Sequence, residues 1–157
     1  MKSIINSDIP DFDLPAYHNG EFITVNSDDL KGHWSILFFY LNDFCFVCPT
    51  ELSDMADIYE ELQQLGVEIY GISADSHFAH KAWHDSSPSI NKIRFPMLSD
   101  RVGKLAKILG SACPETGIVR STFLISPEGK IKTADYHERG VGRDASELMR
   151  KVKVAIQ

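Results

Sequence analysis

The distribution of apolar residues along the chain predicts short strands and helices in alternation. Residues 11–17 and 21–25 have the pattern of two extended segments, and the Asn19-Gly20 pair between them favours a hairpin because both residues tolerate positive φ. The continuous apolar run at 34–40 predicts a strand that is covered on both faces, as in the middle of an α/β sheet. Residues 67–73 are expected to form the next strand.

Apolar residues spaced three and four apart predict a long helix at 49–65. Pro49 suits its first turn because it has no N–H group to leave unpaired, and Gly66 suits its end because glycine tolerates the left-handed conformation. The other expected elements are a helix capped by Asp75 or Ser76 that runs to about His84, a loop at 86–89, a short edge or connecting piece at 95–98, a helix at 103–109, strands at 121–125 and 130–136, and a helix at 144–156. This order predicts an α/β fold with helices packed on both faces of a central sheet.

Length and charge narrow the class of protein. The 157 residues predict one domain, spanning 1–157. The chain has 16 Lys and Arg against 22 Asp and Glu, and its net charge of −6 argues against binding to nucleic acid or to anionic membranes. The longest apolar run, at 36–41, is far shorter than the ~20 residues that span a bilayer. Because the N-terminus also has no signal-peptide or transit-peptide character, we expect a cytoplasmic protein.

The three cysteines, Cys45, Cys48 and Cys113, are too few for a secreted disulfide framework. Cys48 comes where the buried strand leads into the long helix, so unpaired backbone N–H groups and the helix dipole would favour its thiolate. A thiolate is the form that attacks a peroxide or a disulfide, which makes Cys48 a candidate nucleophile. Two other interpretations stay open: small buried core cysteines, and a zinc site, for which a single C-x-x-C pair is weak evidence.

A series of short motifs extends over nearly the whole chain. They are Phe39-Tyr40, Asp43-Phe44, Phe46-Val47-Cys48-Pro49-Thr50-Glu51, Ser73-Ala74-Asp75-Ser76-His77-Phe78, His80-Lys81-Ala82-Trp83, Arg120-Ser121-Thr122-Phe123 and Gly142-Arg143-Asp144. In this combination the chain resembles the peroxiredoxins, specifically the group that includes the alkyl hydroperoxide reductase C subunit. The resemblance implies a thioredoxin-like fold, with a central mixed sheet flanked by helices on both faces, and a thiol-dependent peroxidase.

The resemblance also implies roles for individual residues. Cys48 matches the peroxidatic cysteine, which attacks the O–O bond of a hydroperoxide and becomes a sulfenic acid. Arg120 matches the active-site arginine, whose charge would stabilise the thiolate and orient the peroxide oxygens. Glu51 and Arg143 match positions that hold this arginine in place, although a surface ion pair is the alternative for both.

The active-site loop departs from the family pattern Pro-x-x-x-Thr-x-x-Cys at two positions. Leu41 replaces the proline, which removes a rigid shield over the sulfur, while Tyr40 and Trp83 would still line the substrate pocket with it. Cys45 replaces the threonine, and because a thiol is a weak donor and acceptor, peroxide attack should be slower.

The replacement of threonine by Cys45 also creates a C-x-x-C pair with the spacing of the thioredoxin redox motif. We therefore hypothesise that Cys45 is the resolving cysteine, which forms an intramolecular disulfide with oxidised Cys48. Cys113 is the alternative resolving residue, although a partly buried spectator is favoured for it. Because the chain stops at Gln157, resolution by a cysteine in a C-terminal tail is expected to be absent.

Two other functions remain open at this point. The Cys45/Cys48 pair favours a thioredoxin-like thiol–disulfide oxidoreductase, but Val119-Arg120 occupies the place where thioredoxins carry a proline facing the disulfide. A non-enzymatic holdase or redox-signalling subunit has no specific support in the sequence.

Three histidines, His77, His80 and His84, fall on one face of a predicted helix, and we expect a solvated or interface face there and no metal. Gly140-Val141-Gly142 does not fit a dinucleotide fingerprint, so no cofactor is expected. The expected partners are a hydroperoxide substrate and a protein dithiol reductant, thioredoxin-like or similar. The resemblance further implies a homodimer, or a ring of such dimers.

Overall fold

The computed structural model describes residues 3–40, 48–113, 117–137 and 143–156. Its main feature is one mixed sheet of seven strands. In spatial order these are β2 (Glu21–Asn26), β1 (Asp13–His18), β5 (Met97–Ser99), β4 (Val67–Ser73), β3 (Trp34–Phe39), β8 (Arg120–Ile125) and β9 (Ile131–His137). The three central strands β5, β4 and β3 run parallel, and the pairs outside them are antiparallel.

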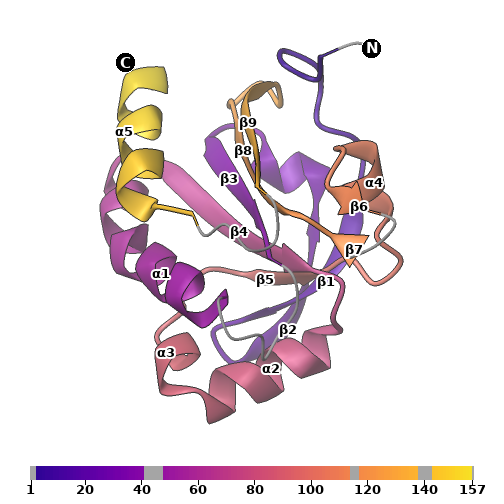
Figure 1. The fold of residues 1–157 in the computed structure, drawn as a ribbon, viewed down its shortest axis with the longest axis vertical. Helices are drawn as coiled ribbons and strands as arrows, with labels where there is room; N and C mark the ends of the chain where they lie inside the picture. The colour runs from indigo at the N-terminus through magenta and orange to yellow at the C-terminus, as the bar shows by residue number, and fades with distance from the viewer. Residues whose placement is uncertain (1–2, 41–47, 114–116, 138–142, 157) are drawn as a thin grey trace.

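Helices cover both faces of this sheet (Figure 1). On one face lie α1 (Cys48–Gln64) and α5 (Ala145–Ala155), and on the other lies α4 (Lys104–Ile108). The short helices η1 (Ser27–Leu30) and α3 (Pro88–Asn91) and the longer α2 (His77–Ser86) complete the helical elements of the described residues. The α/β arrangement expected from the sequence is therefore confirmed.

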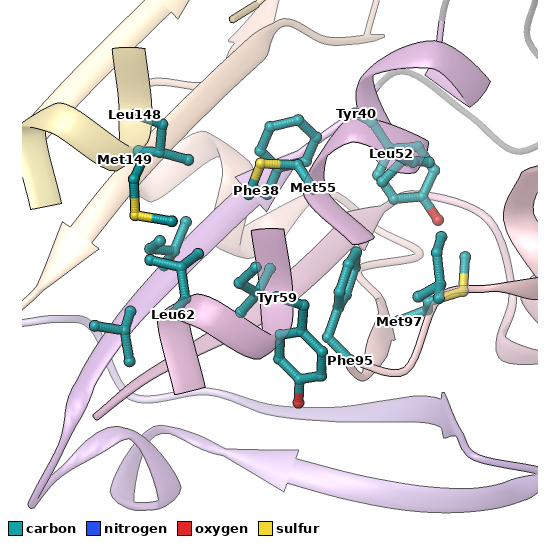
Figure 2. Close-up of a cluster of buried hydrophobic side chains, with 14 of the residues drawn as sticks. Phe38, Tyr40, Leu52, Met55, Tyr59, Leu62, Phe95, Met97, Leu148 and Met149 are labelled. Carbon is teal, nitrogen blue, oxygen red and sulfur yellow. The ribbon is translucent and has the colours of Figure 1, made fainter. Parts of the chain in front are cut away.

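Two hydrophobic cores follow from the alternation of side chains along the strands. In β3, Ile36 and Phe38 point to the α1 face, whereas Leu37 and Phe39 point to the α4 face, and all four are at most 2% exposed. Figure 2 shows the core on the α1 face, where Phe38 lies among side chains of α1 such as Leu52, Met55, Tyr59 and Leu62. This burial on both faces explains why the strand is a continuous apolar run.

Local signals in the sequence set most element boundaries. The hairpin turn has Asn19 at φ 49° and Gly20 at φ 86°, and Gly66 has φ 81° at the end of α1. The hydroxyl of Ser76 accepts a hydrogen bond from the Ala79 amide at 3.1 Å, which caps α2. No helix in the described ranges is both long and apolar enough to cross a bilayer.

Three expectations about local structure were wrong or incomplete. The piece at 95–98 is not at an edge, since β5 pairs with both β4 and β1. Pro96 precedes β5, where its missing N–H is not required, and its carbonyl accepts from the Gly71 amide at 3.0 Å. Pro88 begins α3 where a loop was expected, because proline is tolerated at the first helical position. The ribbon of β6 (Ala112–Cys113) and β7 (Gly117–Ile118) was not anticipated because two-residue strands have no periodicity.

Candidate active site

The N-terminus of α1 is the centre of the candidate site. Cys48 is the first residue of this helix and Glu51 lies in its first turn, where unpaired amide groups and the helix dipole favour negative charge. The side chain of Cys48 lies outside the described residues, as do Leu41 and Cys45 entirely. The predictions made for these side chains remain predictions.

Arg120 reaches Glu51 from the neighbouring strand. It is the first residue of β8, and by alternation it shares the α1 face with Leu124, which belongs to the core under α1. Its Nη1 donates to Oε1 of Glu51, and the two side chains are only 1% and 4% exposed. A residue 69 positions away in sequence thus lies within hydrogen-bond reach of the first turn of α1.

Arg143 completes the charged cluster from the segment just before α5. Its Nε donates to Oε2 of Glu51 at 2.9 Å, its Nη2 donates to Oε1 at 3.1 Å, and its backbone amide donates to Oε2 at 2.7 Å. Its Nη1 donates to the Ser121 carbonyl at 2.8 Å and to the Thr122 hydroxyl at 3.4 Å. With a side chain only 6% exposed, Arg143 is a buried partner of Glu51 and not a surface ion pair.

Phe38 also contacts this arginine, and reasoning from the sequence missed it together with Ser121 and Thr122. The guanidinium carbon of Arg143 lies 3.6 Å from the centroid of the Phe38 ring. Phe38 and Thr122 are directly opposite each other in the β3/β8 register, so one cross-strand pair forms the floor under Arg143. Because side chains alternate along β8, Thr122 lies on the same face as Arg120. This alternation is the sequence feature that could have identified Thr122 as part of the site.

The electrostatics of the cluster favour an additional anion. One carboxylate, Glu51, lies between two guanidinium groups, so the three side chains carry a net charge of +1 in a buried location. Burial raises the pKa of Glu51, but hydrogen bonds from Arg143 and the positive charges of Arg143 and Arg120 outweigh it, so the pKa lies below its ordinary value. A carboxylate held ionised beside two cations leaves the positive charge of one arginine to complement a thiolate.

Tyr40 and Trp83 lie together next to this region, but both are buried. Tyr40 follows β3 and is 0% exposed, Trp83 of α2 is 3% exposed, and their ring centroids are 6.0 Å apart. The Tyr40 hydroxyl lies 3.2 Å from Nδ1 of His80, whose Nε2 lies 2.9 Å from the Leu98 carbonyl. The aromatic pair therefore packs under α2, and its role in lining a substrate pocket stays a prediction.

The expected solvated or interface face of histidines on α2 was wrong for two of its three members. His80 is 0% exposed and His84 is 9% exposed, and Nε2 of His84 lies 3.0 Å from the Ile93 carbonyl. The periodicity placed these residues on one face, but only the packing of α2 against the sheet showed that the face is covered. Among the residues that the structure describes, no three His, Cys, Asp or Glu side chains come together as metal ligands.

The remaining sequence candidates lie largely outside the described ranges. Cys113 is placed in β6 by its backbone, without a description of its side chain. The Gly140–Gly142 segment falls in an undescribed range.

The sheet, the helix that begins at Cys48 and the buried arginine pair fit a thiol-based oxidoreductase. A family model described as the AhpC/TSA family matches residues 5–134. Over 154 residues the chain is 49% identical to alkyl hydroperoxide reductase C of Salmonella typhimurium and 47% identical to that of Bacillus subtilis, covering 98% of this chain and 82% of each relative. The crystal structure of Enterococcus faecalis AhpC superposes with a TM-score of 0.96 at 47% identity, covering 98% of this chain and 93% of that one.

The chain belongs to the AhpC/TSA family. The peroxiredoxin resemblance and the thioredoxin-like fold expected from the motifs are thereby confirmed. The protein is a thiol-dependent peroxidase, and so an oxidoreductase.

Proposed function

We propose that Cys48 is the peroxidatic cysteine and that Arg120 holds its thiolate, with Glu51 and Arg143 as the residues that position Arg120. The observation that carries this proposal is the sharing of one buried carboxylate between two buried arginines at the start of the helix that Cys48 begins. The net positive charge of this cluster and the helix N-terminus act in the same direction on the sulfur.

The chemistry follows from this electrostatic setting. The Cys48 thiolate attacks the terminal oxygen of a hydroperoxide, an S–O bond forms, and the O–O bond breaks. The leaving alkoxide or hydroxide takes up a proton and departs as an alcohol or water, so the sulfur is oxidised to a sulfenic acid and the peroxide is reduced. A guanidinium beside the reacting atoms would stabilise the charge that develops on the leaving oxygen.

The second step of the proposal assigns resolution to Cys45. Its thiolate attacks the Cys48 sulfenic acid, a disulfide forms, and the S–O bond breaks; the departing hydroxide takes up a proton and leaves as water. The C-x-x-C spacing at a helix start supports this assignment, and Cys113 is the competing resolving residue. A protein dithiol would then reduce the disulfide, which returns both cysteines to the thiol state.

The test of both assignments is stopped-flow oxidation by hydrogen peroxide, with intact mass and peptide mapping of the products. The wild type and the Cys45→Ser, Cys48→Ser and Cys113→Ser variants are compared. We expect no reaction for Cys48→Ser, a trapped sulfenic or sulfinic acid for Cys45→Ser, and wild-type behaviour for Cys113→Ser. A Cys48–Cys113 or intersubunit disulfide in the oxidised wild type would refute the role of Cys45.

The C-x-x-C pair also favours a second activity, the exchange of thiols and disulfides in other proteins. Comparing peroxide consumption with reduction of insulin disulfides in the same preparation separates the two activities. Substrates are proposed to be hydrogen peroxide or organic hydroperoxides, and the reductant a thioredoxin-like protein. A cytoplasmic location stays a prediction of the sequence, to be checked by cell fractionation.

The proposal includes one domain over 1–157 and a homodimer, with a ring of dimers as the larger assembly. The single sheet, with one core on each face, supports one domain. The outer strands of the sheet are β2 and β9, which offer edges for pairing with a second copy. An exposed aromatic cluster supports a further contact between copies: Phe22 and Phe78 are 47% and 63% exposed, with ring centroids 5.1 Å apart. Analytical ultracentrifugation of wild type and Phe78→Asp tests this, because loss of rings with retention of dimers is expected.

A further inference from the structure

Arg143 is held in two different ways, along its edge and on its face. Along the edge, its N–H groups donate to the Glu51 carboxylate and to the Ser121 carbonyl. On the face, the Phe38 ring covers the guanidinium at 3.6 Å from the centroid, which is within the range of a cation–π contact. Phe38 is 2% exposed and lies in β3, one of the three central strands, so the ring is held firmly in place.

A pocket beside Arg143 could accommodate its side chain in another position. A pocket of about 190 Å³ opens beside it between α1, α5 and the β8/β9 pair, and both Phe38 and Arg143 line it. Carboxylates of Asp135, Asp144 and Glu147 also line this pocket. Asp135 already pairs with Lys151 and Glu147 with Arg150, so a displaced guanidinium would compete with these cations for them. Without the Phe38 ring, Arg143 would gain room to move within this pocket, which Glu51 also lines.

We propose that Phe38 is a positioning residue for the peroxidase reaction, because its ring keeps Arg143 on Glu51 and thereby leaves the charge of Arg120 for the Cys48 thiolate. This inference rests on the proposed function of Cys48 and Arg120. Glu51 is shared between the two arginines through Oε1, which accepts from Arg120 Nη1 and Arg143 Nη2. When Arg143 moves away, Glu51 neutralises Arg120 alone, and the positive charge near the sulfur falls.

The experiment uses a background with Cys45→Ser and Cys113→Ser, in which Cys48 is the remaining thiol. In this background Phe38→Leu keeps an apolar side chain but removes the ring. We expect the pKa of Cys48, measured by the pH dependence of alkylation, to rise by about half to one unit, and peroxide oxidation at neutral pH to slow roughly five- to tenfold. Phe38→Tyr retains an aromatic face and should restore most of both properties.

Phe123→Leu is the matched control. Phe123 is fully buried on the opposite face of the sheet, where it packs against Phe39 and Tyr136 and belongs to the other core. This variant should lower the melting temperature and leave the Cys48 pKa and oxidation rate at the values of the background. If Phe38→Leu does not fold, Phe38→Met replaces it, because methionine is also apolar and has no ring.

A double-mutant cycle with Arg143→Gln identifies the route of the effect. Phe38→Leu should change neither the Cys48 pKa nor the oxidation rate when Arg143 is already absent, whereas additive effects would overturn the proposal. An unchanged Cys48 pKa in Phe38→Leu would overturn it as well. If Cys48→Ser still reacted with peroxide, the proposed function itself would fail, so the two failures are distinguishable.

Discussion

Two buried polar networks lie on the α1 face of the sheet, and they differ in charge. Under α2, His80 bonds to the Tyr40 hydroxyl and the Leu98 carbonyl, and His84 bonds to the Ile93 carbonyl. Because a carbonyl only accepts, Nε2 of each ring is assigned as the donor. Both histidines are thereby tied to backbone carbonyls of segments that lie next to α2.

At the N-terminus of α1 the buried polar side chains are charged. Glu51, Arg120 and Arg143 carry a net positive charge although all three side chains are at most 6% exposed. Taking three charged groups out of water costs several kcal/mol per ion, so stability alone does not explain this cluster. The comparison teaches that buried polar groups serve two purposes here: the charged cluster is the site that we propose for the chemistry, whereas the histidine network joins α2 to the strands beside it.

The largest expected effect comes from removing the negative charge of the cluster. Glu51→Gln leaves two buried guanidinium groups without their carboxylate and should lower the free energy of unfolding by about 3–5 kcal/mol. Urea denaturation measures this loss. The control is Glu147→Gln, since the Glu147 side chain is 48% exposed and its pairing with Arg150 should contribute less than ~1 kcal/mol. Equal losses in the two variants would show that the buried cluster contributes no more to stability than an exposed ion pair.

Acid should weaken the same cluster. The pKa of Glu51 is lower in the folded protein than its ordinary value, because the arginine contacts outweigh the burial that raises it. Its contribution to stability is therefore complete above the unfolded-state pKa and is lost as the pH falls through the folded pKa, from about pH 5 downward. Urea titrations from pH 7 to pH 3 should show the gap between wild type and Glu51→Gln narrowing. A gap that widens toward low pH would contradict the ionised state of Glu51.

The histidine network predicts an intermediate effect. Tyr40→Phe removes the hydroxyl that lies 3.2 Å from Nδ1 of His80, which should cost about 1–3 kcal/mol of unfolding free energy because a buried hydrogen bond is lost. Tyr17→Phe is the comparison, since its hydroxyl lies 3.5 Å from Nδ1 of His84 and makes a weaker contact. Thermal unfolding of both variants would refute this ranking if Tyr17→Phe proved the more damaging change.

The smallest effect concerns a buried hydroxyl outside both networks. The Oγ of Ser35 has no hydrogen-bond partner among the described residues, although Ser35 is fully buried in β3. Ser35→Ala should leave the free energy of unfolding unchanged or raise it slightly, because no bond is lost. Ser121→Ala removes a hydroxyl that lies 2.7 Å from the Ser111 hydroxyl and should cost about 1 kcal/mol. Denaturant midpoints of the two variants check the difference, and a larger loss for Ser35→Ala would be inconsistent with it.

Much of the fold could be predicted because its signals are local. The apolar stripe of α1, the glycine that ends it and the serine that caps α2 each act within one or two helical turns. The errors occurred where neighbours in space decide the outcome. Nothing local distinguishes an edge strand from β5 between two partners, or an exposed histidine from His80 under a packed helix.

The candidate site divides in the same way. The motifs pointed to Glu51, Arg120 and Arg143, but they did not show that both arginines share one carboxylate. Phe38 was known only as part of a buried strand, because its contact with Arg143 joins β3 to a segment more than a hundred residues further along the chain. A cross-strand register was needed to bring Thr122 opposite it.

By itself the sequence determined the order of strands and helices and the start of a helix next to Cys48, since backbone preference and apolar spacing act over a few residues. Only the tertiary structure decided which charges are buried together. Contacts between Glu51 and arginines 69 and 92 positions away exist because the parallel β3/β4 core and the β8 strand bring these segments to one end of the sheet. Once buried, each charged side chain is stable only with its partners. Those partners are far apart in the sequence, so the sequence alone does not reveal them.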